Sequence, residues 1–169
     1  MNKQSLLFTG VVAIIAISLM LMAIQIFAKK LKIKPESDQK INISYSFWFG
    51  SLLISFILIL KTALDLLENS IELIIYSKTI DNVFIAIMEK ISIFIGFSFL
   101  FTFLAYLIVQ YILKFSIGSR VDEIEIEKDN IGYYLIKGLL LIFLVISLAS
   151  IFEHFLRWFM PIVETPFYH

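Results

Sequence analysis

The chain has 169 residues, of which 60% are hydrophobic, and its mean hydropathy is +0.92. Both values exceed those of ordinary soluble domains and predict an integral membrane protein. The 14 basic and 14 acidic residues cancel, which removes any whole-chain electrostatic case for nucleic acid as a partner. Cysteine is absent, which excludes disulfides, thiolate metal sites and cysteine nucleophiles.

The first predicted span covers residues 6–28. A secretory signal is the alternative, but the apolar core of a signal is typically ~7–15 residues long and this stretch is longer. Basic residues follow it directly, and basic residues hold the adjoining end of a span in the cytoplasm. They are Lys29, Lys30, Lys32 and Lys34. The sequence therefore predicts a retained span with its N-terminus outside.

The second predicted span has its apolar core at residues 47–60. Four charged residues follow at helical spacing and would form one stripe on a continuing helix: Lys61, Asp65, Glu68 and Glu72. Apolar residues still occupy the other side as far as about residue 76. We therefore expect this helix to project beyond the bilayer on the outer side.

The third predicted span covers residues 91–113, after a turn in which Asp81 is a plausible cap. This helix would also overhang on the outer side and pack beside the extension of the second helix. Within it, Ser92 with Gly96 and Ser98 with Thr102 are small residues four apart, a spacing that lets helix backbones approach closely. Small residues are also common in membrane helices for no such reason.

The fourth predicted span covers residues 133–155. Lys137 falls one turn inside its start, where a long side chain can extend to water. The tail, residues 159–169, contains two prolines and several aromatic residues and is typical of a short interfacial anchor.

Two loops have alternating apolar and charged residues of opposite sign, KKLKIK near residue 30 and VDEIEIEKD from Val121. Alternation is the period of a strand. We expect the lysines of the first loop to lie beside the glutamates of the second, as paired extended segments or across a subunit boundary, or else both loops are simply solvated. The residues concerned are Lys30, Lys32, Lys34, Glu123, Glu125 and Glu127.

Basic residues set the expected orientation, because they concentrate in cytoplasmic loops. Most of those outside the spans fall in loops 29–44 and 114–132: Lys29, Lys30, Lys32, Lys34, Lys40, Lys114, Arg120 and Lys128. Both loops are therefore predicted to be cytoplasmic and both termini to lie outside. With a lysine-, isoleucine- and phenylalanine-rich composition, the expected location is a bacterial plasma (inner) membrane.

Residues 42–65 recur in a weaker form at residues 130–153. Asn42 and Gly50 match Asn130 and Gly138, and the acidic residues at the far ends, Asp65 and Glu153, also match. We therefore expect an all-α, four-helix membrane protein forming one domain over residues 1–169. Its two tandem two-helix repeats, about 6–76 and about 80–158, would insert in the same orientation.

This doubled pair of spans, with an Asn ahead of the second helix of each pair, resembles the YjfL-like family of small bacterial inner-membrane proteins. The residues that carry the resemblance are PESDQKINISYSFWFG and EIEIEKDNIGYYLIKG, with Asn42 and Asn130 at the matching positions. The resemblance would cover about residues 8–156 and implies the fold, but it brings no established activity with it.

Charged residues near hydrocarbon are costly and are the first places to look for function. The candidate pore or intramembrane polar residues are Lys61, Asp65, Glu68, Lys137, Glu153 and Arg157. In one interpretation Lys61 with Asp65, and Glu153 with Arg157, are four-apart pairs that neutralise each other at the bilayer edge. In the other, Asp65 and Glu153 face one another across the repeat axis and form an acidic ring in an oligomer.

No catalytic motif is present, and two histidines without ligand spacing are too few for a metal site. We expect no enzyme activity, no cofactor and no metal. The sequence favours a membrane subunit or scaffold that contacts lipid and assembles with itself or with a partner membrane protein. The alternative is a small oligomeric ion channel or membrane-permeabilising protein with Asp65 and Glu153 near an outer vestibule.

Overall fold

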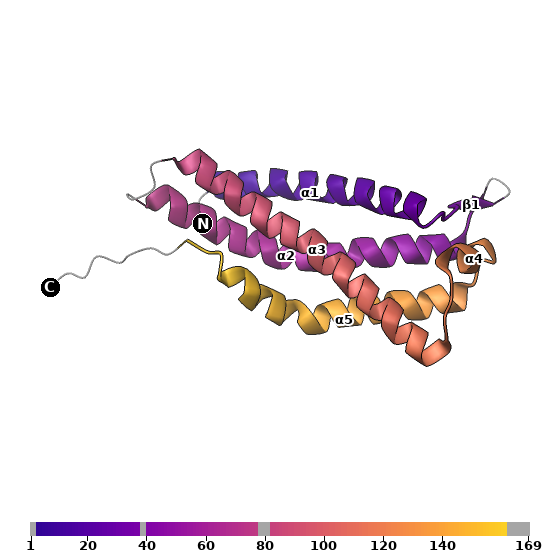
Figure 1. Cartoon of the computed structure of the whole chain (residues 1–169). Helices are drawn as coiled ribbons and strands as arrows, with labels where there is room; N and C mark the ends of the chain where they lie inside the picture. Colours follow the sequence, from indigo (N-terminus) through magenta and orange to yellow (C-terminus); the bar gives the residue numbers. More distant parts are fainter. Residues whose placement is uncertain (1–2, 38–39, 78–81, 162–169) are drawn as a thin grey trace.

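The computed structural model describes residues 3–37, 40–77 and 82–161, and nearly all of them are helical (Figure 1). In chain order the elements are α1 (Lys3–Lys30), β1 (Glu36–Ser37), β2 (Lys40–Ile41), α2 (Ile43–Tyr76), α3 (Val83–Ile117), α4 (Asp122–Glu127) and α5 (Ile131–Arg157). The two strands form an antiparallel ladder of two residues each between α1 and α2. The prediction of an all-α chain is confirmed.

Helices α1, α2, α3 and α5 are each long and apolar enough to cross a membrane. At 1.5 Å per residue, α2 and α3 are about 50 Å long, against about 30 Å of hydrocarbon in a typical bilayer. Their lengths of 34 and 35 residues therefore agree with the predicted overhang. The side of the membrane on which they project stays a prediction.

Helix α2 is the central helix of the bundle. It packs against α5, α3 and α1, and α3 also packs against α5, whereas α1 and α3 make little contact. In Figure 1, α3 crosses α2 obliquely, with α1 on one side and α5 on the other. A groove lined by residues of α1 and α3 lies between these two helices.

The two ends of the bundle differ. One end, which we call the loop end, contains residues 31–37, 40–42 and 118–130, with the β1–β2 ladder and α4 (Figure 1). The opposite end holds the start of α1, the end of α2, the start of α3 and the end of α5. The predicted cap Asp81 and most of the predicted tail, residues 162–169, lie outside the described residues. Asn82 caps α3 by accepting the backbone N–H of Ile85 at 3.2 Å.

The interior is filled by large side chains, with an aromatic series between α3 and its neighbours. Ring centroids are 4.7 Å apart for Phe56 and Phe99 and 4.8 Å apart for Phe101 and Phe152. Of the small residues on α3, Ser98 and Thr102 are fully buried, while Ser92 and Gly96 are exposed.

Helices α2 and α5 pack tightly against each other at Gly138. A Cβ atom at this position would lie 3.0 Å from Cβ and 3.3 Å from Oγ of Ser51. Such distances are tighter than ordinary Cβ contacts, so a larger residue here would require the Ser51 side chain to shift by a few tenths of an ångström. Gly50, at the corresponding position of the predicted first repeat, has no atom within 4 Å of such a Cβ.

Helices α2 and α5 start directly after Asn42 and Asn130, as the predicted repeat requires. The two starts are capped differently. Asn130 accepts the N–H of Tyr133 at 3.3 Å, whereas at the start of α2 the N–H of Ser44 donates to Oδ1 of Asp129 at 2.7 Å. Matching starts are compatible with a duplication, but the repeat and its common orientation stay predictions.

The predicted strand in VDEIEIEKD is wrong, because residues 122–127 form helix α4. Asp122 and Ile126, four residues apart, are the buried members of this helix, so the burial has helical rather than alternating period. The predicted charge pairing is realised in one contact, with Nζ of Lys34 lying 3.7 Å from Oε1 of Glu127. Both side chains are exposed, and extended segments do not pair here.

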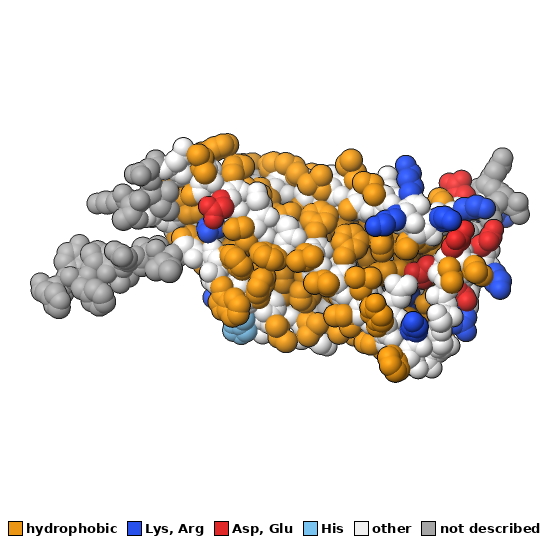
Figure 2. All heavy atoms as spheres, viewed as in Figure 1, with side chains coloured by type: hydrophobic (Ala, Val, Ile, Leu, Met, Phe, Trp, Pro, Cys, Tyr) orange, Lys and Arg blue, Asp and Glu red, His pale blue; other side chains and the backbone are white. Residues whose placement is uncertain are grey.

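Hydrophobic and charged side chains are separated along the length of the bundle. In the face shown in Figure 2, hydrophobic side chains cover the middle, and most charged side chains gather at the loop end. A smaller group of charges marks the opposite end. This banded distribution is the one expected of a protein whose middle lies in hydrocarbon.

Candidate functional site: a buried ion pair at the loop end

The polar centre of the molecule is an ion pair between α5 and α4. Nζ of Lys137 lies 2.7 Å from Oδ1 and 2.9 Å from Oδ2 of Asp122. Both side chains are only 3% exposed. A buried ionised group is very costly without a partner, so each residue requires the other.

Two tyrosines and a tryptophan complete the cluster. The Tyr106 hydroxyl donates to Oδ2 of Asp122 at 2.6 Å and accepts from Nζ of Lys137 at 2.9 Å and from Nε1 of Trp48 at 3.1 Å. The Tyr134 hydroxyl lies 3.0 Å from Oδ1 of Asp122. These side chains come from α2, α3, α4 and α5, so the cluster joins four helices at one point.

The lysine is also surrounded by aromatic faces. Its Nζ lies 4.5 Å from the ring centroid of Tyr106 and 5.7 Å from those of Tyr133 and Tyr134. Cation–π attraction is strongest where water is excluded, as it is at this buried position. Phe27 of α1 adds an edge contact to Tyr106 at 5.4 Å, which brings the first helix to the same cluster.

Within the cluster the hydrogen-bonding capacity of the lysine is fully used. A lysine ammonium has three N–H donors, and Lys137 has three acceptors, two on Asp122 and one on Tyr106. Each carboxylate oxygen of Asp122 accepts from the lysine and from one tyrosine. The arrangement holds α4 against the bundle and leaves the ammonium no free donor for a ligand.

Lys137 was predicted to extend to water, and that prediction is wrong. The residue is only 2% exposed, because its chain turns inward to Asp122. Its position one turn inside the predicted fourth span did mark it correctly as a charged residue in an apolar helix. Asp122 was not singled out from the sequence, since nothing in an acidic loop distinguishes the one carboxylate that folds inward.

The other candidates lie on the far half of the bundle. Lys61 and Asp65 are exposed, and no ion pair joins them although both fall in the described part of the chain. Glu68 is half-buried, and its Oε1 has no hydrogen-bond partner. Glu153 and Arg157 form the predicted four-apart pair at 2.6 Å. A pore role for any of these residues stays a prediction.

A metal-binding cluster of three or more His, Asp or Glu side chains is not found in residues 3–37, 40–77 and 82–161. Comparison with known protein families, with curated proteins and with solved structures finds no match to this chain. The fold and the cluster together define a class: an α-helical protein with four helices long and apolar enough to cross a membrane, locked at one end by a buried ion pair.

Proposed function

We propose that this chain is a non-enzymatic integral membrane protein that serves as a subunit or scaffold, assembling with copies of itself or with a partner membrane protein. The observation that carries the proposal is the closed interior at the loop end. The Lys137 ammonium has no donor left over, and Trp48 and Tyr106 fill the space around it. An interior of this kind favours a packing role over catalysis or transport through a single copy.

The outward surface supports the same proposal. On α3 and α5, Leu104 and Ile151 are 47% and 62% exposed and border an apolar hollow of about 280 Å³. Two chemically similar environments suit such a surface: lipid tails or the apolar face of another helix. Helix association in membranes depends on close packing, since lipid tails are as apolar as leucine.

The experiment is a mass measurement by light scattering on the purified protein in detergent, corrected for bound detergent. A multiple of 19.6 kDa is expected if the chain assembles with itself. Leu104→Trp, which fills the hollow on the α3 and α5 face, is compared with Ile15→Trp on the exposed face of α1. A side chain that faces lipid tolerates either substitution. A packed interface that contains Leu104 or Ile15 has no room for the tryptophan at that position.

A monomeric mass, with no membrane protein co-purifying after crosslinking in cells, would contradict the subunit proposal. Loss of assembly with Leu104→Trp alone would place the interface on α3 and α5. Equal loss with both variants would indicate general destabilisation, which a thermal unfolding measurement on each variant detects.

A second function, the small ion channel, is favoured by one observation on α2. The half-buried Glu68 has a carboxylate oxygen with no hydrogen-bond partner, and the nearby Asp65 is exposed. Carboxylates near a vestibule favour cations. Reconstituted liposomes would show cation flux that falls in Asp65→Asn with Glu153→Gln, whereas absence of flux at every gradient and voltage would eliminate the channel.

A further inference from the structure

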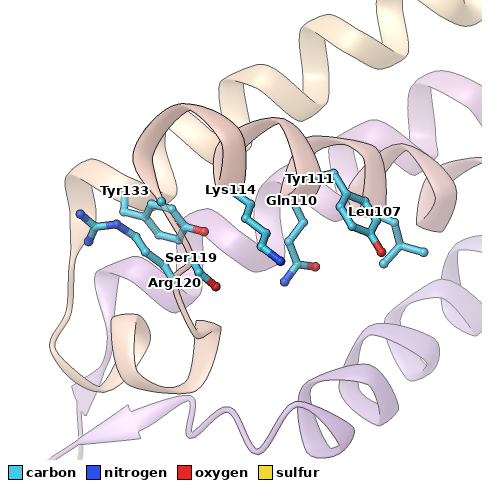
Figure 3. Close-up of a pocket in the computed structure, with 8 residues that line it drawn as sticks. Leu107, Gln110, Tyr111, Lys114, Ser119, Arg120 and Tyr133 are labelled. Atoms are coloured by element: carbon cyan, nitrogen blue, oxygen red, sulfur yellow. The ribbon is translucent and has the colours of Figure 1, made fainter.

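A hollow of about 280 Å³ lies at the loop end beside the last turns of α3, where the chain turns toward α4 (Figure 3). Its lining on this stretch of the chain extends from Leu107, about three turns before the end of α3, to Arg120, just after that end. The predicted third span ends at residue 113, so the hollow lies near the predicted surface of the bilayer. The lining residues are Leu107, Gln110, Tyr111, Lys114, Gly118, Ser119, Arg120 and Tyr133.

Two polar side chains of this hollow, those of Lys114 and Gln110, face one space. Figure 3 shows the Lys114 ammonium and the Gln110 amide converging in the gap between α3 and the end of α1. Arg120 behaves differently. Its guanidinium carbon lies 5.5 Å from the ring centroid of Tyr133, and its Nη1 donates to Glu125 at 3.1 Å, so its charge is already paired.

An apolar groove continues from the hollow. It has a volume of about 370 Å³ and shares Leu107 with the hollow. The residues lining it come from α1 and α3: Ala23, Ile26, Phe27, Lys30, Phe103 and Leu107. Lys30 is therefore the one charged residue of the groove among the residues described, and it is in the last turn of α1, at the loop end.

This groove exists because α1 and α3 make little direct contact. Both helices pack instead on α2, and Phe27 and Phe103 form the floor between them with ring centroids 5.3 Å apart. None of the described residues that line the hollow or the groove is acidic. A site with lysines at its interfacial end and an apolar groove behind them has the polarity of an anionic phospholipid.

We propose that the hollow and the groove together bind one anionic phospholipid, with its phosphate between Lys114 and Lys30 and an acyl chain along Phe27, Phe103 and Leu107. The amide of Gln110 and the hydroxyl of Ser119 supply donors to headgroup oxygens. This proposal does not depend on whether the chain assembles into an oligomer. The site lies at the end of α3 opposite to the predicted overhang.

Free phosphate shares the headgroup chemistry but makes no use of the groove. Basic pockets between membrane helices on the cytoplasmic side are known sites for anionic headgroups, and each basic residue near such a surface contributes about 1 kcal/mol, or about fivefold in affinity. The predicted cytoplasmic position of loop 114–132 places this site on the side where anionic lipid is met.

The experiment uses the full-length protein, stripped of lipid in detergent, and native mass spectrometry with equal amounts of phosphatidylglycerol and phosphatidylcholine. Wild type is expected to retain one phosphatidylglycerol in preference to phosphatidylcholine. Inorganic phosphate in large excess is expected not to displace it, because phosphate gains nothing from the groove. Displacement by phosphate would assign the hollow to a free anion and overturn the lipid proposal.

Two variants test the headgroup contacts. Lys114→Gln is expected to lower retention of phosphatidylglycerol about fivefold, and Lys114→Gln with Lys30→Gln about 25-fold. The matched control is Lys40→Gln with Lys128→Gln, which removes the same charge from exposed positions at the loop end that line neither hollow nor groove. An equal loss in the control would show a general surface attraction and overturn the proposal.

A third variant tests the groove without altering charge. Ala23→Phe places a ring in the groove and is expected to lower phosphatidylglycerol retention several-fold while the melting temperature stays within a few degrees of wild type. Unchanged lipid retention in a folded Ala23→Phe protein would show that the acyl chain does not lie in the groove. Unchanged retention in both folded lysine variants would overturn the site as a whole.

Discussion

Nζ of Lys137 and Oδ1 of Asp122 are 2.7 Å apart, both side chains are almost fully buried, and the pair connects α5 to α4. Because α4 is only six residues long, it has no stability of its own and depends on tertiary contacts. The ion pair therefore fixes the path of the chain between α3 and α5, and with it the shape of the whole loop end.

Replacing one member of this pair is expected to cost far more than replacing both. Lys137→Met leaves the Asp122 carboxylate buried without a counter-ion, which should lower the free energy of unfolding by about 3–5 kcal/mol. Lys137→Met with Asp122→Asn removes both charges and should cost less than the sum of the single changes. Titration with a denaturing detergent, followed by tryptophan fluorescence, measures both. Additive losses would show that the two side chains do not interact.

The Tyr106 hydroxyl is expected to matter more than its size indicates. In Tyr106→Phe the indole N–H of Trp48 and one oxygen of Asp122 each lose a partner, so the protein should lose about 1–3 kcal/mol of stability. Trp48 is fully buried and its emission should shift as its hydrogen bond is lost. The control is Tyr76→Phe, at an exposed tyrosine, which should change stability by less than about 0.5 kcal/mol. Equal losses of stability in Tyr106→Phe and Tyr76→Phe would show that the hydrogen bonds of the Tyr106 hydroxyl do not stabilise the fold.

The positions of the long helices were predictable from the sequence because apolar length is a strong signal. Residues 6–28 and 133–155 were expected, and the helices cover Lys3–Lys30 and Ile131–Arg157. The partner of Lys137 was not predictable. Asp122 is 15 residues away in sequence, and its neighbours Glu123 and Glu125 have the same charge but remain more exposed.

The misassigned strand has a simple cause. Val121, Ile124 and Ile126 alternate with acidic residues, which indicates a strand when only the apolar residues are counted. In the fold the inward positions are Asp122 and Ile126, and a buried carboxylate counts as polar in any periodicity test. Because Asp122 is buried by its ion pair with Lys137, the inward positions of this segment cannot be identified from its apolar residues alone. The corresponding lysine-rich loop contributes only the exposed contact of Lys34 with Glu127.

Gly138 and Gly50 provide a matched pair of substitutions at corresponding positions of the predicted repeats. Gly138→Ala brings a methyl group to 3.0 Å from Ser51 Cβ and should destabilise the protein by about 1–3 kcal/mol through overpacking. Gly50→Ala meets no atom within 4 Å and should be neutral or stabilising by about 0.5–1 kcal/mol, because alanine favours helix. Thermal unfolding in detergent compares them.

Ser51→Gly is the control for the glycine prediction, since it removes the side chain that the new methyl group meets. Combined with Gly138→Ala, it should recover part of the lost stability, apart from the helix cost of a second glycine. No recovery would mean that the cost at Gly138 arises elsewhere, such as at the Phe47 carbonyl 3.8 Å away.

Asp129 is expected to couple the two halves of the chain by capping α2. Its Oδ1 accepts the N–H of Ser44 at 2.7 Å, and its backbone has φ of 47°, a conformation that Asp and Asn tolerate. Asp129→Ala loses the cap and adopts that backbone poorly, so it should cost about 1–2 kcal/mol. Asp129→Asn keeps an acceptor oxygen and the same backbone preference and should be close to wild type. A loss in Asp129→Asn as large as in Asp129→Ala would point to the charge rather than the cap.

The predicted topology can be tested cleanly because the chain has no cysteine. Single substitutions Glu36→Cys and Ile124→Cys place a thiol at two exposed positions of the loop end, and Tyr76→Cys places one at the opposite end. None of these removes a basic residue, on which the orientation depends. A membrane-impermeant maleimide applied to intact cells should label only Tyr76→Cys, and lysed cells should show labelling of all three.

Labelling of Glu36→Cys and Ile124→Cys from opposite sides of the membrane would contradict the assignment of four membrane-crossing helices, which requires both positions to lie on the same side. Labelling of both from outside would invert the orientation, and the anionic lipid site would then face the outer leaflet.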